Sequence, residues 1–223
     1  MSNSLKNIKL PCYSKAEEFI NTISHAFGVI LGIVVLILSV TRSLEYKDTL
    51  TVISCIIYGV TMIVLYSMST IYHGLRHENA KKIFRVLDHC TIYLLIAGTY
   101  TPIAIGGLRE DSAVLGWSVV IIQWFLCVLC LILTGIDLKK FSIFSLICYV
   151  IMGWLLAFFW NPTVQAFSKS GFAFCLSGGI MYTIGAVLYA LGKKKKYMHS
   201  AFHIFVLLGS LLQFLGIYLY ILK

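Results

Sequence analysis

Three histidines in this chain have a spacing and placement that suit a metal site. His199 and His203 are four residues apart, and positions i and i+4 share one face of an α-helix. A pair with this spacing can present two imidazoles to one metal ion, and His73 supplies a third from a separate apolar segment. Three imidazoles and a water form a catalytic zinc site, where zinc lowers the pKa of the water from about 15.7 towards 7. The pattern predicts zinc at His73, His199 and His203.

An acid and a hydroxyl accompany these histidines. Asp88 begins the apolar segment that follows His73, and a carboxylate at a membrane boundary requires a cation or a hydrogen-bond donor beside it. We predict that Asp88 is the catalytic general base towards water and then the acid towards a leaving amine or alcohol. Ser69 precedes His73 by one helical turn and is predicted to donate a hydrogen bond to the substrate carbonyl.

Each of these residues also has a structural interpretation. A histidine near a helix end is commonly an interfacial polar group, Asp88 could cap its helix or pair with Arg85, and Ser69 could pack between helices. The metal site is favoured because four such groups are expected at one depth. His25 and Asn21 share a helix face on the same side and are predicted to support the metal ligands from behind.

The composition indicates what must position these residues. The chain has 223 residues, of which 59% are hydrophobic and only 12% charged, and its mean hydropathy is +0.89. These values indicate a multi-pass integral protein of the cell membrane. The net charge of +9 does not point to a nucleic-acid partner, because the basic residues lie in short loops between apolar runs. The expected partners are membrane lipids and a lipid-like substrate.

Seven apolar runs are each long enough to cross about 30 Å of hydrocarbon. The sequence therefore predicts an all-α bundle of seven transmembrane helices, residues 22–222, after a cytoplasmic N-terminal segment, residues 1–21. The predicted spans are Thr22–Thr41, Leu50–Tyr72, Val86–Gly106, Val114–Ile136, Phe141–Trp160, Phe172–Gly192 and Ser200–Leu222.

The distribution of basic residues predicts the orientation. Thirteen of the eighteen Lys and Arg lie on the side that holds the N-terminus, and basic loops are retained in the cytoplasm. The N-terminus should be cytoplasmic and the C-terminus outside. The run Lys193 to Lys196 is interpreted as an anchor of this topology, with gathering of anionic headgroups as a second interpretation. This orientation brings the ends of the second, third and seventh helices, with their histidines and Asp88, to the cytoplasmic face.

The cysteines do not suggest a disulfide framework. There are seven, an odd number, and most lie inside apolar runs, where a thiol behaves as a small hydrophobic group. Cys127 and Cys130 form a C-x-x-C inside a predicted span, which we interpret as packing.

The ordered motifs EEFINTISHAFG, SMSTIYH, RVLDHCTIYLLIAGTYTP and HSAFHIFVLLGS resemble the bacterial hemolysin III family, relatives of the progestin and adiponectin receptors. The resemblance implies a seven-helix fold with zinc held by His73, His199 and His203. It also implies that Asp88 contacts the zinc-bound water and that Ser69 is the serine of the S-x-x-x-H motif within SMSTIYH. The wider superfamily includes alkaline ceramidases, which implies zinc-dependent hydrolysis of a lipid amide or ester at the cytoplasmic leaflet.

The same resemblance leaves two other functions open. The family name implies a pore-forming haemolysin, in which zinc would only tie helices together. Few ionisable residues lie in the middle of the spans, contrary to what an ion pathway needs. A receptor of the adiponectin-receptor type is the third interpretation. Gln213 stands where the family pattern has another histidine, away from the predicted zinc ligands. The sequence does not fix the lipid or the oligomeric state.

Overall fold

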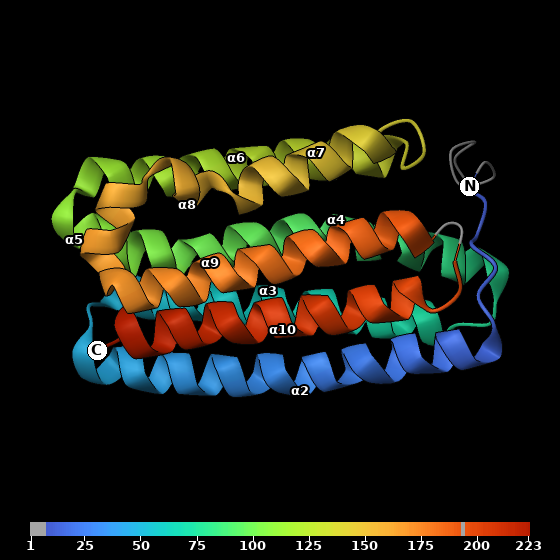
Figure 1. The fold of residues 1–223 in the computed structure, drawn as a ribbon, viewed down its shortest axis with the longest axis horizontal. Helices are drawn as coiled ribbons and strands as arrows, with labels where there is room; N and C mark the ends of the chain where they lie inside the picture. The colour runs from blue at the N-terminus through green and yellow to red at the C-terminus, as the bar shows by residue number, and fades with distance from the viewer. Residues whose placement is uncertain (1–7, 193–194) are drawn as a thin grey trace.

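The computed structural model describes residues 8–192 and 195–223, and this part of the chain is helical without a strand. The helices run side by side along an elongated bundle (Figure 1). They are α2 (Lys15–Tyr46), α3 (Thr49–Gly74), α4 (Glu78–Ile103), the π-helix η1 (Ala104–Leu108), α5 (Arg109–Asp111), α6 (Ala113–Ile136), α7 (Ser142–Gly153), α8 (Leu155–Phe158), α9 (Trp160–Gly192) and α10 (Met198–Tyr220).

Within the described residues, six continuous helical stretches are long and apolar enough to cross a membrane, and α7 is a shorter apolar helix. The stretches are α2, α3, α4 together with η1 and α5, α6, α9 and α10. The predicted all-α bundle and the multi-pass membrane location are confirmed. The fifth predicted span, Phe141–Trp160, falls on two short helices, α7 and α8, and ends at the first residue of α9.

The prediction of one unbroken helix over Phe141–Trp160 is wrong. The helix stops at Gly153, and side chains bond the backbone groups that the break frees. The Tyr100 hydroxyl donates to Gly153 O at 2.8 Å and accepts from Leu156 N at 3.1 Å, while Gln123 Nε2 donates to Met152 O at 2.8 Å. A break inside a membrane is tolerated because these groups are satisfied within the protein.

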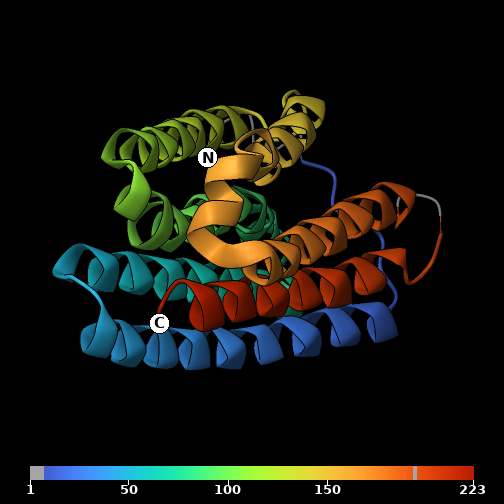
Figure 2. The same ribbon diagram turned by 60° about the vertical axis from the view of Figure 1, so that its left-hand side comes forward.

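A second kink separates the start of α9 from its main part. Ser168 has a φ of 65° and a ψ of 167°, outside the helical region, so α9 consists of two helices joined at this residue. In Figure 1 the first turns of α9 run across one end of the bundle, and its main part runs along the bundle. The view in Figure 2 shows the change of direction.

Local sequence signals explain where the first helices begin. Ser14 and Glu17 form a reciprocal capping box, which starts α2 at Lys15, seven residues before the predicted span. Asp48 caps α3 by accepting from the hydroxyl and the amide of Thr51, at 2.7 and 3.0 Å. These two bonds, with a contribution from Arg109, hold the pKa of Asp48 at about 2.

Close helix packing fixes how α2 sits against α3. A Cβ added at Gly28 would lie only 2.3 Å from the Tyr66 ring, so this contact requires a residue without a side chain. The Tyr66 hydroxyl in turn lies 2.7 Å from Ser210 Oγ on α10. In both ribbon views α2, α3 and α10 lie together (Figures 1 and 2).

The topology brings four helix ends to one end of the bundle. The first residues of α2, α4 and α10 and the last residues of α3 lie at the end where the chain begins (Figure 1). The loop between α6 and α7 lies at this end too. Lys193 and Lys194 of the predicted anchor lie outside the described residues.

Candidate metal centre

The three predicted ligand histidines meet at this end of the bundle. His73 is next to the last residue of α3, and His199 and His203 occupy the first two turns of α10. His199 Nε2 lies 3.3 Å from His73 Nε2 and 3.1 Å from His203 Nε2. One ligand atom from each histidine falls within 4.8 Å of the others, and all three side chains are buried. The predicted convergence of α3 and α10 is confirmed.

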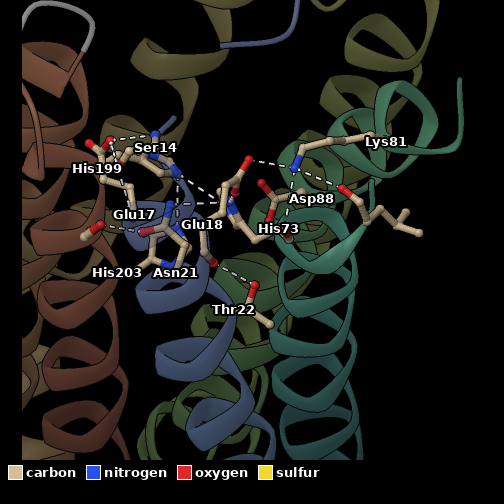
Figure 3. A network of polar contacts seen from close by, with 12 residues as sticks. Ser14, Glu17, Glu18, Asn21, Thr22, His73, Lys81, Asp88, His199 and His203 are labelled. Atoms are coloured by element: carbon tan, nitrogen blue, oxygen red, sulfur yellow. Dashed lines mark hydrogen bonds and ion pairs between the residues drawn. The ribbon is translucent and has the colours of Figure 1, made fainter. Parts of the chain in front are cut away.

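The Nδ1 atoms of two of these histidines face groups that accept a proton. His73 Nδ1 donates to Glu18 Oε2 at 2.6 Å, since a carboxylate only accepts (Figure 3). His203 Nδ1 lies 3.4 Å from Ser24 Oγ, whose own proton goes to Asn21 O at 3.0 Å. These contacts place the ring proton of His73 and of His203 on Nδ1, so the Nε2 lone pairs of both rings face His199 Nε2. His199 Nδ1 has no hydrogen-bond partner among the described residues.

Buried lone pairs in this arrangement fit a metal ion. A proton on His199 Nε2 could satisfy only one of the two lone pairs that face it, whereas a cation can accept the lone pairs of all three imidazoles. Two nitrogens bound to tetrahedral zinc at about 2.0–2.1 Å would lie about 3.3 Å apart, close to the observed 3.1 and 3.3 Å. His73, His199 and His203 could therefore hold a metal ion.

Asn21 and His25 lie directly against the histidines, where they were predicted to be. The Oδ1 atom of Asn21 accepts from Ser200 Oγ at 2.7 Å, and its Nδ2 lies 3.4 Å from His73 Nδ1. The His25 ring stacks on the His203 ring, with centroids 3.7 Å apart. Both His25 nitrogens are buried and have no hydrogen-bond partner among the described residues.

Asp88 and Ser69 lie near the histidines but do not join the ligand group. Figure 3 draws Asp88 beside His73, and its carboxylate lies 3.8 Å from His89 Nδ1. Ser69 is buried one turn before His73 on α3, and its hydroxyl has no hydrogen-bond partner among the described residues. The catalytic roles of both residues stay predictions.

Comparison with known proteins identifies the family. The profile of the family described as "Haemolysin-III related" matches residues 13–214. The chain belongs to this family. Hemolysin-3 of Bacillus cereus is 38% identical over 206 residues, which cover 92% of each chain. The Hemolysin-3 homolog of Bacillus subtilis is 35% identical over 207 residues, which cover 93% of this chain and 95% of the relative.

A human protein is similar to this chain at lower identity. The haemolysin-III-related chain is 26% identical to the human Monocyte to macrophage differentiation factor, over 96% of this chain and 87% of the relative. No solved structure matches it.

Sequence reasoning missed Glu18, the acid that holds His73. Its second oxygen accepts from Lys81 Nζ at 2.6 Å, so the carboxylate joins α2 to both α3 and α4. Glu18, Asn21 and His25 follow one another at spacings of three and four, which is one face of a helix. That stripe of polar residues was the signal that could have identified Glu18.

Tyr13 was also missed, and it covers the histidines from the N-terminal segment. Its ring stacks on the His199 ring, with centroids 4.9 Å apart and an angle of 14° between the planes. Burial raises the pKa of Tyr13, and the nearby Tyr189 raises it further, so the phenol stays protonated at neutral pH. The haemolysin-III-related site is therefore closed on this side by a neutral aromatic ring.

Proposed function

We propose that this haemolysin-III-related protein is a zinc-dependent hydrolase that cleaves an amide or ester bond in a membrane lipid at the cytoplasmic leaflet. The observation that carries the proposal is the set of three buried imidazoles whose Nε2 atoms face one another at 3.1 and 3.3 Å. Bound zinc supplies Lewis acidity, which polarises a carbonyl oxygen and makes water acidic at neutral pH. His73, His199 and His203 hold the ion.

The residues around the histidines prepare them for this role. The Glu18 carboxylate accepts the Nδ1 proton of His73, and Ser24 Oγ faces Nδ1 of His203, so both rings present Nε2 as a lone pair. Asn21 and its bond to Ser200 tie α2 to α10 beside them. The ligand positions are thus fixed before a metal arrives.

Two further residues act on the substrate in this proposal. Asp88 transfers the proton, and Ser69 stabilises the negative charge that develops on the carbonyl oxygen. Asp88 takes a proton from the attacking water and returns it to the leaving amine or alcohol. Ser69 is positioned by α3 one turn deeper than His73, and its hydroxyl has no hydrogen-bond partner among the described residues. It is free to donate to the substrate carbonyl oxygen as negative charge develops there.

Metal analysis tests the centre. The full-length protein, purified in a detergent without chelators, should contain close to one zinc per chain. His203→Ala should lose nearly all of it, whereas His77→Ala should retain it, because His77 is exposed and caps α4 away from the ligand group. Unchanged zinc in His203→Ala would refute the ligand assignment.

Turnover on a panel of acyl amides and esters tests the chemistry separately. Asp88→Asn and Ser69→Ala should retain zinc, and activity should fall by about 10²-fold or more in each. Wild-type protein that contains zinc but hydrolyses none of the panel would count against the hydrolase while leaving the metal centre in place.

A second candidate function is permeabilisation of membranes, which the name of the Bacillus cereus relative, Hemolysin-3, favours. In that case the three histidines would tie α3 to α10 and would have no catalytic role. Release of a trapped dye from liposomes, with the same rate in wild type and in Asp88→Ala, would support the pore. Liposomes that retain the dye while the protein hydrolyses its substrate would exclude the pore.

A further inference from the structure

A second feature lies at the same end of the bundle as the histidines. It is a cavity of about 480 Å³, a volume within the range of small-molecule sites. The N-terminal segment, the first turn of α2, α4, the end of α9 and the turn before α10 form its walls. Its charged and aromatic lining residues are Tyr13, Glu17, Arg85, Tyr189, Lys195 and Lys196.

The lining is strongly basic. Arg85, Lys195 and Lys196 bring three positive charges, and Glu17 is the acid among the lining residues that the structure describes. The carboxylate of Glu17 is already occupied, because it accepts from Tyr197 N at 2.8 Å and from Ser14 N at 2.9 Å. Glu17 keeps its negative charge and is attracted to Lys196, so the three cations and one acid leave the described lining with a net charge of +2.

The guanidinium of Arg85 is only partly used by the protein. Its Nη1 donates to Lys9 O, and the guanidinium also hydrogen-bonds the Tyr189 side chain. Its buried Nε has no acceptor among the described residues. Asp88, one turn later on α4, lies 3.8 Å from His89 Nδ1 and is not part of the cavity lining. A guanidinium with unused donors beside two lysines is an arrangement that binds anions with several oxygens.

The cavity shares a wall with the candidate metal centre. Tyr13 lines it and stacks on His199, and the Tyr189 ring, which also lines it, lies 5.7 Å from the His199 ring. The hydroxyl of Tyr189 lies 3.2 Å from His89 Nε2. A molecule bound in the cavity would thus lie one aromatic ring away from the three histidines.

We propose that this cavity binds the phosphate ester of an anionic lipid headgroup. A lining with a net charge of +2 matches the two charges and the free oxygens of a phosphate monoester better than the single charge of a carboxylate. A lipid is favoured as the source because the cavity lies where four membrane helices end, at the level of the headgroups. Its role as the headgroup subsite of the substrate rests on the proposed hydrolase, whereas the binding itself does not.

Calorimetry of the full-length protein in dodecyl maltoside, a detergent without phosphate, tests the proposal. The three probes are phosphatidic acid with two six-carbon chains, the matching diacylglycerol and glycerol 3-phosphate. Phosphatidic acid should bind most tightly. The double variant Lys195→Gln and Lys196→Gln should weaken its binding about tenfold or more, as expected when charged hydrogen bonds are lost.

A matched control is available on the same side of the protein. Lys139 and Lys140 lie in the loop between α6 and α7, at the same end of the bundle, and are exposed and outside the cavity lining (Figure 1). Lys139→Gln with Lys140→Gln removes the same charge and should leave the affinity unchanged. Zinc content should be unchanged in both double variants, since neither touches the histidines.

The possible outcomes separate the two proposals. Equal binding of diacylglycerol and phosphatidic acid, or equal losses in the two double variants, would overturn the phosphate site. Glycerol 3-phosphate that binds as tightly as the lipid would overturn the lipid assignment. Tight binding of phosphatidic acid without turnover would count against the hydrolase alone, and turnover without phosphate-dependent binding would count against this cavity alone.

Discussion

Glu18 is the residue on which the geometry of His73 depends. Its carboxylate holds His73 Nδ1 and Lys81 Nζ, each at 2.6 Å. We predict that Glu18→Gln lowers zinc affinity about 10–100-fold, because an amide accepts the imidazole proton more weakly and makes the ring a poorer ligand. Competition with a chromophoric chelator measures this change.

The control for Glu18 is another glutamate that pairs with a lysine but lies away from the histidines. Glu78 pairs with Lys82 at 2.6 Å on the surface of α4, so Glu78→Gln should leave zinc affinity unchanged. If Glu18→Gln binds zinc as tightly as wild type, the carboxylate serves only to join α2 and α4, and His73 is oriented by packing.

The sequence predicts the three candidate metal ligands better than the residues that hydrogen-bond to them. His199 and His203 share a helix face by spacing alone, and topology brings His73 to the same end. Which groups meet the Nδ1 atoms depends on how α2 is rotated about its axis, and packing sets that rotation. The polar stripe on α2 could have singled out Glu18, but the contacts of Glu18 and Ser24 with the Nδ1 atoms became visible only in the structure.

At the scale of the helices, hydropathy predicts where the chain crosses the membrane but not whether a crossing is continuous. Phe141–Trp160 is uniformly apolar, yet it breaks after Gly153 and again before Trp160. The break is stabilised by Tyr100 from α4, more than fifty residues earlier in the chain. A contact this distant in sequence cannot be seen in a local pattern, although Gly153 and Pro162 mark the region as one where a helix is easily interrupted.

The contact between α2 and α3 allows a prediction at this scale. Gly28→Ala places a methyl group 2.3 Å from the Tyr66 ring, which is held by its bond to Ser210. The helices must separate or the ring must turn, at a cost of about 1–3 kcal/mol. The midpoint of thermal unfolding in detergent should therefore fall.

Gly135→Ala is the matched substitution for that experiment. A Cβ at Gly135, in the last turn of α6, would meet no atom within 4 Å. The gain in helix propensity, up to about 1 kcal/mol, should leave stability unchanged or raise it. Equal losses in the two variants would show that the close approach at Gly28 does not limit stability.

For the whole molecule, the site requires that α2, α4 and α10 begin, and α3 end, on one side of the membrane. The structure brings these ends together (Figure 1), and the basic loops predict that this side is the cytoplasm. A hydrolase with this orientation would reach lipids of the inner leaflet. The orientation is therefore the feature that connects the chemistry of the site to its substrate.

The cysteines of the protein provide a direct test of this orientation. All seven lie in the described part of the chain, and Cys12 is exposed whereas the other six are buried. Cys12 lies just before α2, so a membrane-impermeant maleimide should label the protein in inverted vesicles and not in intact cells. Cys12→Ser should abolish the labelling.

The opposite end of the bundle provides the complementary reporter. Asp111, at the end of α5, is exposed and lies between the third and fourth crossings. In the Cys12→Ser background, Asp111→Cys should be labelled in intact cells, because an odd number of crossings separates it from the N-terminus. The opposite pattern in both reporters would place the histidines at the outer leaflet, and the substrate would then have to be an outer-leaflet lipid.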